Sequence, residues 1–318
     1  MKFRIFIILI SAIALASCSA PEYKKAEGVV WGTTYHIVYK SNRDLSDSIV
    51  AEMRKVELAL SMFDPASNVS QINSRSTCVA SPYLKAVMTV AKRVHSAAGG
   101  MFDPTVAPLV DLWGFGRKGH ETPIPDSCRI SEALSKVGLS RIRMSGDSIL
   151  MPEGMELDFS AIAKGFGVDC VAAALRRNGS TDYMVEIGGE VSLSGVNTYG
   201  KEWRIMVESP VDSLNGNPDV LQLSNCAVAT SGNYRNKRII TADSVIGHTI
   251  NPVTGYPMQT PVLSATVIAP SCILADALAT ALMASDPESA PALIKKFPAT
   301  RAILYVKDKS AVETVMIP

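Results

Sequence analysis

Six short segments of the sequence gather residue types that could bind an anionic ligand and move a proton. They are richer in Gly, Pro, Asp, Thr and His than the apolar stretches around them, and most lie where a predicted helix or strand begins or ends. The segments are 61–65, 99–105, 158–165, 230–235, 247–255 and 275–280. Their carboxylates, hydroxyls, lysine and histidine suggest a site for a phosphate or similar anion, a hard cation and a general base.

Asp276 and Thr280 are four residues apart in a stretch that is otherwise small and apolar. On a helix, this spacing places both side-chain oxygens on one face. A carboxylate buried there is costly unless a cation compensates it, and oxygen donors favour Mg²⁺ or another hard cation over zinc. The alternative is an exposed aspartate on a polar helix face, and the residues alone leave both interpretations open.

Asp158 and Lys164 stand at the predicted start of a helix that ends at 178–179. Asp158 could cap this helix while Lys164 remains solvated. The free N–H groups of the helix start, together with the lysine, could instead bind a phosphate. The sequence contains neither the P-loop pattern G-x-x-x-x-G-K-[ST] at this point nor the hydrolase elbow G-x-S-x-G, so neither site is predicted.

His248 is the histidine that lies in a turn rich in Thr, Asn, Pro and Gly. A loop histidine is usually structural or merely exposed. A base beside an anion and a cation is nevertheless a sensible use of it, because imidazole titrates near neutral pH.

Helices and strands that must position these residues follow from the spacing of apolar residues. Helices are predicted at 46–60, 81–98, 131–138, 158–178, 272–284 and 289–296. Strands are predicted at 29–39, 183–187, 191–193, 203–208, 227–230, 238–241, 262–268, 302–306 and 312–317. Because the two types are mixed rather than strictly alternating, an α+β fold is favoured over a doubly wound sheet.

The composition excludes several classes of protein. Lys+Arg 31 against Asp+Glu 30 in 318 residues gives a net charge of +1, which argues against a nucleic-acid-coating role. A hydrophobic share of 47% with 19% charged residues excludes a disordered chain. The cysteines at 78, 128, 170, 226 and 272 show no metal-binding spacing and are expected to be buried thiols.

The N-terminus has the pattern of an export signal. Lys2 and Arg4 precede an apolar run at 5–16 that is too short to span a membrane, and small residues follow it. The sequence Leu-Ala-Ser-Cys at 15–18 resembles the bacterial lipobox, in which the cysteine is lipidated; an ordinary cleaved signal is the alternative. We therefore expect a lipoprotein signal peptide at 1–17, a tether at 18–27 and one domain at 28–318. The protein would be anchored through Cys18 in the bacterial cell envelope, on the periplasmic face of the inner membrane.

Nine motifs in order along the chain resemble those of the ApbE family of flavin transferases. They are GTTY at 32–35, LSMFDP at 60–65, GMFDPT at 100–105, WGFG at 113–116, DFSAIAKG at 158–165, EIGGE at 186–190, ATSGNY at 229–234, HTINPVTGYP at 248–257 and ADALAT at 275–280. Each is weak alone, but nine in order make a chance match very improbable. The resemblance implies a single ApbE-like (T-fold-like) mixed α/β domain with antiparallel or mixed sheets and packed helices.

The activity implied by the resemblance is that of an exported, Mg²⁺-dependent FAD:protein FMN transferase. Such enzymes split FAD, release AMP and attach FMN through a phosphoester to Thr or Ser of an exported acceptor protein. The usual acceptors are a subunit of a respiratory ion pump or a flavin-bearing reductase. Two alternatives remain: a Mg²⁺-dependent FAD pyrophosphatase, which gives FMN and AMP, and a non-catalytic FAD-binding lipoprotein.

The resemblance also assigns roles to individual residues. His248 would be the catalytic base that activates the acceptor hydroxyl, and Mg²⁺ would be held by Asp276, Thr280 and the backbone carbonyl of Ala161. The FAD site would be lined by Phe63, Met101, Phe102, Asp103, Asp158, Lys164 and Ile250, with Trp31 and Tyr35 as further candidates.

Two positions depart from the family pattern. Asn251 stands where the family usually has Asp, which removes a charge near His248 and could change the pKa or orientation of the histidine. Trp31 stands where Met is common before Gly-Thr, which could change the wall of the flavin pocket.

Overall fold

The computed structural model describes residues 21–75, 77–117, 119, 123–207, 210, 219–233, 237–241, 244–308 and 311–318. The expected signal peptide at 1–17 and Cys18 therefore lie outside the described residues. Within the described residues, no helix is both long enough and apolar enough to cross a membrane.

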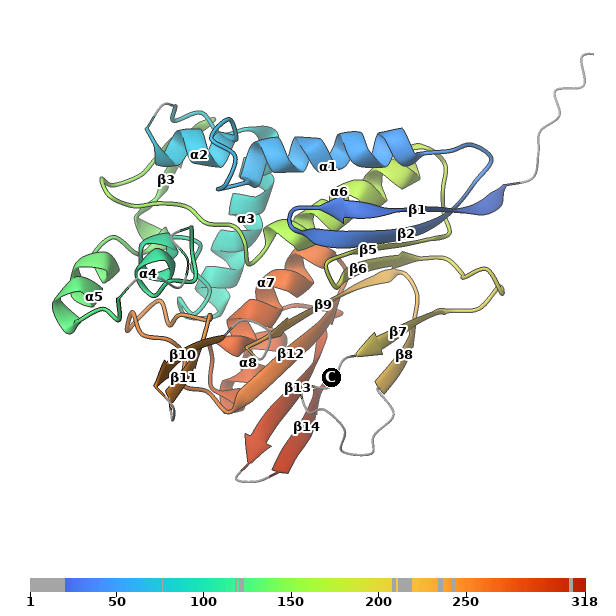
Figure 1. The fold of residues 1–318 in the computed structure, drawn as a ribbon. Coiled ribbons are helices and arrows are strands. Elements are labelled where there is room, and N and C mark those ends of the chain that lie inside the picture. The colour runs from blue at the N-terminus through green and yellow to red at the C-terminus, as the bar shows by residue number, and fades with distance from the viewer. Residues whose placement is uncertain are drawn as a thin grey trace, which may run out of the picture.

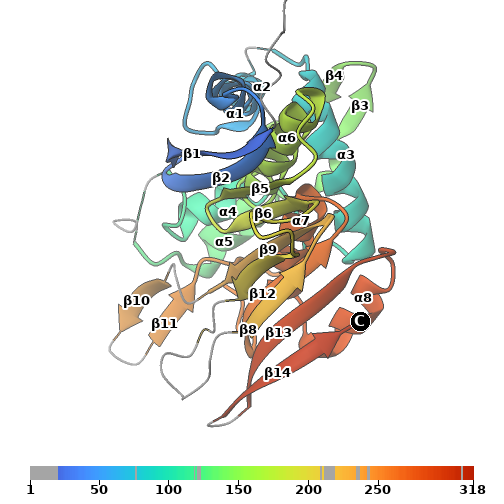
Figure 2. The ribbon, with the colours of Figure 1, turned by 90° about the vertical axis from the view of Figure 1, so that its right-hand side faces the viewer.

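Eight strands form one antiparallel sheet, seen edge to edge in Figure 2 from β1 to β14. In spatial order they are β1 (Glu22–Val30), β2 (Thr33–Ser41), β5 (Tyr183–Ile187), β6 (Glu190–Ser194), β9 (Cys226–Gly232), β12 (Val262–Ala269), β13 (Arg301–Asp308) and β14 (Ala311–Ile317). β5 and β6 follow one another through a short turn, whereas β2 with β5, β6 with β9, and β9 with β12 pair across long stretches of intervening chain. The sheet therefore brings segments far apart in sequence side by side.

Four longer helices cover one face of this sheet (Figure 1): α1 (Ser46–Leu60), α3 (Pro82–Ala97), α6 (Ala163–Arg177) and α7 (Cys272–Met283). Helix α7 packs on β9 and β12 and is flanked by α3 and α6. Nearly all of its residues are buried, which explains why its sequence is apolar on every side. The lone carboxylate of this helix therefore lies inside the protein.

The opposite face of the sheet is covered in part by a hairpin of β7 (Trp203–Val207) and β8 (Asp219–Leu223). Trp203 and Leu223 of the hairpin bury Val191, Leu193 and Ile268 of the sheet. The centre of the sheet is thus apolar on both faces. The helices cover one face, and this hairpin covers apolar residues of the other.

Shorter elements surround this core. They are α2 (Asn68–Asn73), α4 (Ala107–Leu112), α5 (Ser127–Leu134), α8 (Ala290–Ile294), two 3₁₀ turns (Leu139–Arg141 and Pro287–Ser289), and the hairpins β3 (Arg143–Ser145) with β4 (Ser148–Leu150) and β10 (Lys237–Thr241) with β11 (Ser244–Gly247). Helices α4 and α5 share a small apolar cluster with Ile250, which lies in the loop after β11. This cluster fixes that loop beside the main body.

The α+β prediction is confirmed, and most predicted elements lie within a few residues of their expected bounds. The predicted helix at 131–138 is α5, which begins earlier because Asp126 caps it by accepting from the Arg129 amide at 2.9 Å. The predicted helix start at Asp158 is wrong: α6 begins at Ala163, and residues 160–162 form a turn.

The strand predicted at 29–39 is wrong as a single element, because the chain reverses at Trp31 and Gly32. Both residues have positive φ, at 50° and 74°, as two-residue hairpin turns require. The expected tether is wrong for residues 22–27, which form most of β1 and pair with β2. This strand is polar and rich in lysine because it forms an edge of the sheet, and such a sequence does not indicate a strand.

The expectation of buried cysteines is correct only in part. Cys272 is buried, and Cys170 and Cys226 are half-buried, whereas Cys78 and Cys128 are exposed. These five thiols are free, so within the described residues the fold is held by packing rather than by disulfides.

Candidate active site

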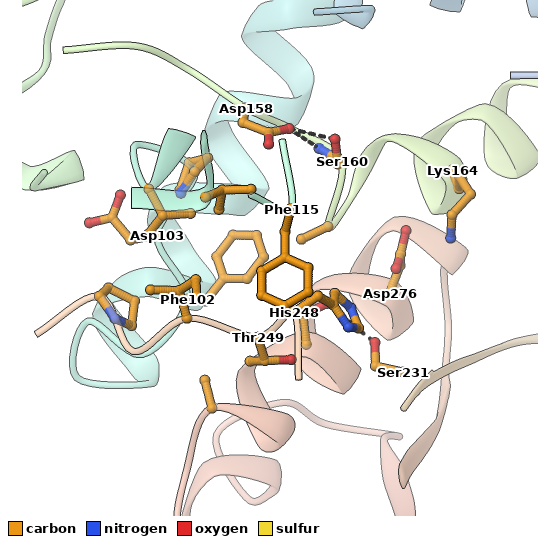
Figure 3. Close-up of a pocket in the computed structure, with 18 of the residues that line it drawn as sticks. Phe102, Asp103, Phe115, Asp158, Ser160, Lys164, Ser231, His248, Thr249 and Asp276 are labelled. Atoms are coloured by element: carbon orange, nitrogen blue, oxygen red, sulfur yellow. Dashed lines mark hydrogen bonds between the residues drawn. The ribbon is translucent and has the colours of Figure 1, made fainter. Parts of the chain in front are cut away.

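A cavity of about 440 Å³ opens where the start of α6, the inner face of α7 and several loops converge. Eleven residues expected at the site line it: Phe63, Met101, Phe102, Asp103, Asp158, Ala161, Lys164, His248, Ile250, Asp276 and Thr280. Figure 3 shows a charged end with Lys164 and Asp276 and an aromatic end with Phe102 and Phe115. The cavity thus offers separate places for a charged group and for a flat apolar one.

Asp276 lies at the charged end and is only 3% exposed. Its Oδ2 accepts a hydrogen bond from the Gly165 amide at 2.9 Å. In a continuous helix that amide would donate to the carbonyl of Ala161 four residues earlier, so this bond leaves the Ala161 carbonyl available in the cavity wall. Thr280 follows one turn after Asp276, and its Oγ1 lies 3.3 Å from Ser231 Oγ.

The donors in this corner are a carboxylate, a hydroxyl and a backbone carbonyl. All three are oxygen donors of the kind that Mg²⁺ prefers, so Asp276, Thr280 and Ala161 fit such an ion. No group of three or more His, Cys, Asp or Glu side chains in the described part of the chain could hold a metal ion. The fit therefore depends on the hydroxyl and the carbonyl as much as on the carboxylate.

Gly165 makes the close contact between α6 and α7 possible. A Cβ atom at this position would lie 2.4 Å from the Cys272 carbonyl oxygen and 2.7 Å from Asp276 Cβ. Real Cβ atoms do not approach backbone this closely, so only glycine allows the Gly165 amide to reach Asp276.

Glu190 is a site residue that the sequence analysis did not identify. It is 3% exposed and lines the cavity at the start of β6, and Lys164 Nζ donates to its Oε1. Its second oxygen is buried without a hydrogen-bond partner in the described structure. A glutamate directly after the glycine pair at 188–189, in a strand of otherwise apolar and small residues, was the signal that could have revealed it.

The charged groups in this corner shift the pKa values of one another. Burial raises the pKa of Glu190 to about 7, although Lys164 opposes this shift. Burial also disfavours the charged form of Lys164, but Asp276 and Glu190 more than offset it and raise the pKa of the lysine. Lys164 is therefore a cation fixed between two carboxylates in the first turn of α6.

The aromatic end contains two expected rings, Phe63 and Phe102, and one unexpected ring, Phe115. Phe102 is buried in the wall, and Phe115, from the WGFG motif, packs edge to face on His248 with 6.4 Å between ring centroids. Phe63 lies at the rim and is 71% exposed, so its ring adds apolar surface to the mouth of the cavity. This end suits a flat aromatic group.

His248 directly follows β11, and its ring points toward the adjacent Ser231 (Figure 3). The adjacent Thr249 donates to Asn233 Oδ1 at 2.7 Å, which ties this loop to the end of β9. The histidine is therefore held between the charged and aromatic ends, where a base could act on a group bound at either one.

Asn251 is engaged in its own turn. Its Oδ1 accepts from the amides of Val253 and Thr254, at 2.8 and 3.0 Å. A carboxylate could accept the same two bonds, so the asparagine preserves the turn that follows His248.

Asp103 and Asp158 line the cavity and accept hydrogen bonds from neighbouring groups, on both oxygens in Asp103 and on Oδ1 in Asp158. Asp103 accepts from the Thr105 amide and hydroxyl and from the Leu139 amide. Asp158 accepts from the Ser160 amide at 2.8 Å and from the Ser160 hydroxyl, and burial raises the pKa of Asp158. Both carboxylates therefore hold the loops that shape the wall.

Two further candidates lie outside the cavity. The ring of Trp31 packs on Gly167 of α6, where an added Cβ would lie 2.2 Å from it, and Tyr35 lies over Gly28 on β1. Neither residue lines the cavity, and their contribution to a flavin site stays a prediction. Tyr234 and Arg235, from the segment 230–235, lie outside the described residues.

Comparisons with known proteins agree with one another. The model of the ApbE family matches residues 31–304. The FAD:protein FMN transferase of Vibrio cholerae serotype O1 is 35% identical over 295 residues, covering 89% of this chain and 87% of the relative. The enzyme of the same name from Haemophilus influenzae is 32% identical, covering 90% of this chain and 87% of the relative. The solved structure of the flavin transferase ApbE from Vibrio cholerae superimposes with a TM-score of 0.85 at 32% identity, over 93% of this chain and 97% of that one.

Proposed function

The chain belongs to the ApbE family, and from this premise we propose that it is a Mg²⁺-dependent FAD:protein FMN transferase. It would cleave FAD to AMP and attach FMN through a phosphoester to a Thr or Ser of an exported acceptor protein. Membership of the family agrees with the order of the nine motifs, and the transferase activity agrees with the names of the relatives.

The convergence of His248, Lys164 and Asp276 in one cavity is the observation that carries this proposal. A dinucleotide has a flat ring system and a diphosphate. The aromatic end of the cavity suits the ring system, and the cationic lysine beside the α6 N-terminus suits the diphosphate. Phosphoryl transfer depends mainly on positioning and on compensation of charge, which such a site supplies.

In the proposed reaction, the acceptor hydroxyl oxygen forms a bond to the phosphorus of the FMN half of FAD. The bond from that phosphorus to the bridging oxygen breaks, and AMP leaves with the bridging oxygen. His248 takes the hydroxyl proton, and its contact with Phe115 fixes the ring for this purpose. Lys164 balances phosphate charge, while Glu190 holds the lysine in place.

Asp276, Thr280 and the Ala161 carbonyl are the residues that would hold Mg²⁺. The ion would supply further compensation for the negative charge on the phosphates. Asp276 remains fixed for this role because the Gly165 amide donates to one of its oxygens.

The activity test combines the purified protein, FAD and MgCl₂ with an acceptor domain that carries a target Thr. We expect a flavin-fluorescent acceptor band that survives denaturing electrophoresis, and no band with EDTA or with the acceptor Thr replaced by Ala. AMP and free FMN formed without any acceptor would instead support a pyrophosphatase. Bound FAD with no turnover under any condition would support a carrier.

Replacing His248 by Ala tests the base. We expect kcat to fall by about 10²–10⁴-fold while FAD binding, followed by fluorescence quenching, changes little. The matched control is His36→Ala, because His36 is an exposed β2 residue paired with Glu186 and does not line the cavity. Unchanged turnover in the His248→Ala variant would exclude the histidine as the base.

We also propose that Cys18 is lipidated and anchors the enzyme in the bacterial cell envelope, on the periplasmic face of the inner membrane. The lipobox-like sequence at 15–18 supports this proposal. The acceptor would then be an exported flavoprotein, such as a subunit of a respiratory ion pump or a reductase.

A further inference from the structure

Neither of the two helices that meet at the charged corner is capped by its own N-terminal residue. The residue before α6 is Ile162, which has no side-chain acceptor, and Ser271 before α7 makes no capping bond. In α6 the Ala163 amide donates to the Phe159 carbonyl and the Phe166 amide to the Ile162 carbonyl, so these two amides are satisfied by the preceding turn. The Gly165 amide of α6 and the Cys272 and Ile273 amides of α7 bond instead to side chains from outside their own helices.

Each helix supplies the cap of the other. Asp169 of α6 accepts from the first two amides of α7: the Cys272 amide donates to Oδ1 and the Ile273 amide to Oδ2, both at 2.9 Å. In return, Asp276 of α7 accepts from the Gly165 amide in the first turn of α6 at 2.9 Å. The two helices are thus joined by reciprocal capping bonds on either side of the Gly165 contact.

This arrangement fixes the position of α7 along its axis. Asp276 lies one turn after Cys272, and Thr280 lies one turn further, so both move with the start of the helix. A slip of α7 by one residue would displace them by about 1.5 Å. Metal–ligand distances tolerate only about 0.2 Å, so the oxygens of α7 would then no longer match the Ala161 carbonyl, which belongs to the segment before α6.

We propose that Asp169 is a positioning residue for the metal site, which holds Asp276 and Thr280 in register with Ala161 by capping α7. The inference rests on the proposed function, since it presumes that these three residues bind Mg²⁺. Asp169 does not line the cavity, so it acts through the helix rather than on the substrate.

The test measures binding of Mn²⁺ to the full soluble domain by electron paramagnetic resonance, and of Mg²⁺ by calorimetry, both without FAD. In Asp169→Ala, which loses both capping bonds, we expect the metal Kd to rise about 10–100-fold. Asp169→Asn keeps one acceptor oxygen and should show a smaller rise; it decides the matter if the alanine variant does not fold. Saturating Mg²⁺ should restore most of kcat in both variants, whereas a general loss of structure would not respond to the metal.

The matched control is Asp126→Ala, which removes the capping aspartate of the peripheral helix α5 and should leave the metal Kd unchanged. Metal binding by folded Asp169→Ala and Asp169→Asn as tight as that of the unsubstituted protein would overturn this inference alone. Failure of the unsubstituted protein to bind either metal would overturn the metal assignment and this inference together.

Discussion

At the scale of single residues, the charged corner of the cavity depends on one lysine. Glu190 and Asp276 are each 3% exposed. The positive charge of Lys164 interacts favourably with both carboxylates and so offsets part of the cost of burying them. Because a buried carboxylate without a partner is strongly unfavourable, Lys164 has a structural role in addition to any contact with phosphate.

Replacing Lys164 by Met separates these two roles. The single variant leaves Glu190 buried and unpaired, so we expect the free energy of unfolding to fall by about 3–5 kcal/mol. In Lys164→Met/Glu190→Gln, which has no charge left in this pair, much of that stability should return while FAD affinity stays low. Urea denaturation and FAD titration of both variants measure the two effects.

The control for this prediction is Lys85→Met. Lys85 pairs with Asp147, whose side chain is 68% exposed, so the loss should not exceed about 1 kcal/mol. A double variant at 164 and 190 that is as unstable as the single one would show that the unpaired carboxylate is not the cause.

The buried carboxyl of Asp169 makes the stability of the fold depend on pH. Burial raises its pKa from 3.8 to about 6, despite the two amides that donate to it. Between about pH 4 and 6 the folded protein therefore holds a proton that the unfolded chain releases, so the stability contributed by Asp169 is present below pH 4 and is lost as the pH rises through 6. In Asp169→Asn this loss is absent. Urea midpoints from pH 4 to 7 should therefore fall more steeply for the unsubstituted protein, and parallel curves would contradict the assignment.

At the scale of elements, the sequence predicted the bounds of helices whose capping residues lie next to them in the chain. Helix α3 begins at a Ser-Pro pair, and its Ser81 accepts from the Leu84 amide, as the sequence indicates. Helix α6 was predicted to start too early, because Asp158 has the residue type of a cap although its partner is Ser160 in a preceding turn. The true caps of α6 and α7 come from other parts of the chain and have no local signal.

Two glycines of α6 differ in what an added methyl group would meet. Gly165→Ala would press on the backbone of α7, so we expect a loss of several kcal/mol and a weaker metal site. Gly167→Ala would meet the ring of Trp31, which can move, so its cost should be smaller. Replacing Trp31 by Met in the Gly167→Ala background should recover stability, whereas the same replacement in the Gly165→Ala background should not. Thermal unfolding of the four variants checks this, and equal recovery in both backgrounds would refute the explanation.

At the scale of the whole molecule, the site is assembled from segments between Met62 and Ala284 that meet because of the strand order of the sheet. The motifs predicted which residues gather there. They could not predict that Glu190 pairs with Lys164, since this contact arises only after β6 and α6 are brought together. Nor could they predict that Asp103 accepts from the Leu139 amide, which lies 36 residues away in the sequence. Nor could they predict that the turn at Trp31 directs its ring onto Gly167 of α6.

The proposed lipid anchor leads to a prediction about the molecule as a whole. Strand β1 begins at Glu22, so the four residue steps from Cys18 to it span at most about 14 Å, and a lipidated Cys18 would hold the folded domain close to the bilayer.

We expect Cys18→Ser, expressed in a bacterium, to move the protein from the membrane fraction to the soluble fraction. Turnover with a soluble acceptor domain should not change, because the described residues that line the cavity all lie from Met62 onward. Replacing the exposed Cys78 by Ser is the control and should leave the protein in the membrane fraction. If Cys18→Ser still sediments with membranes, the attachment is made by another part of the chain, since a single lipidated cysteine is the whole basis of the proposed anchor.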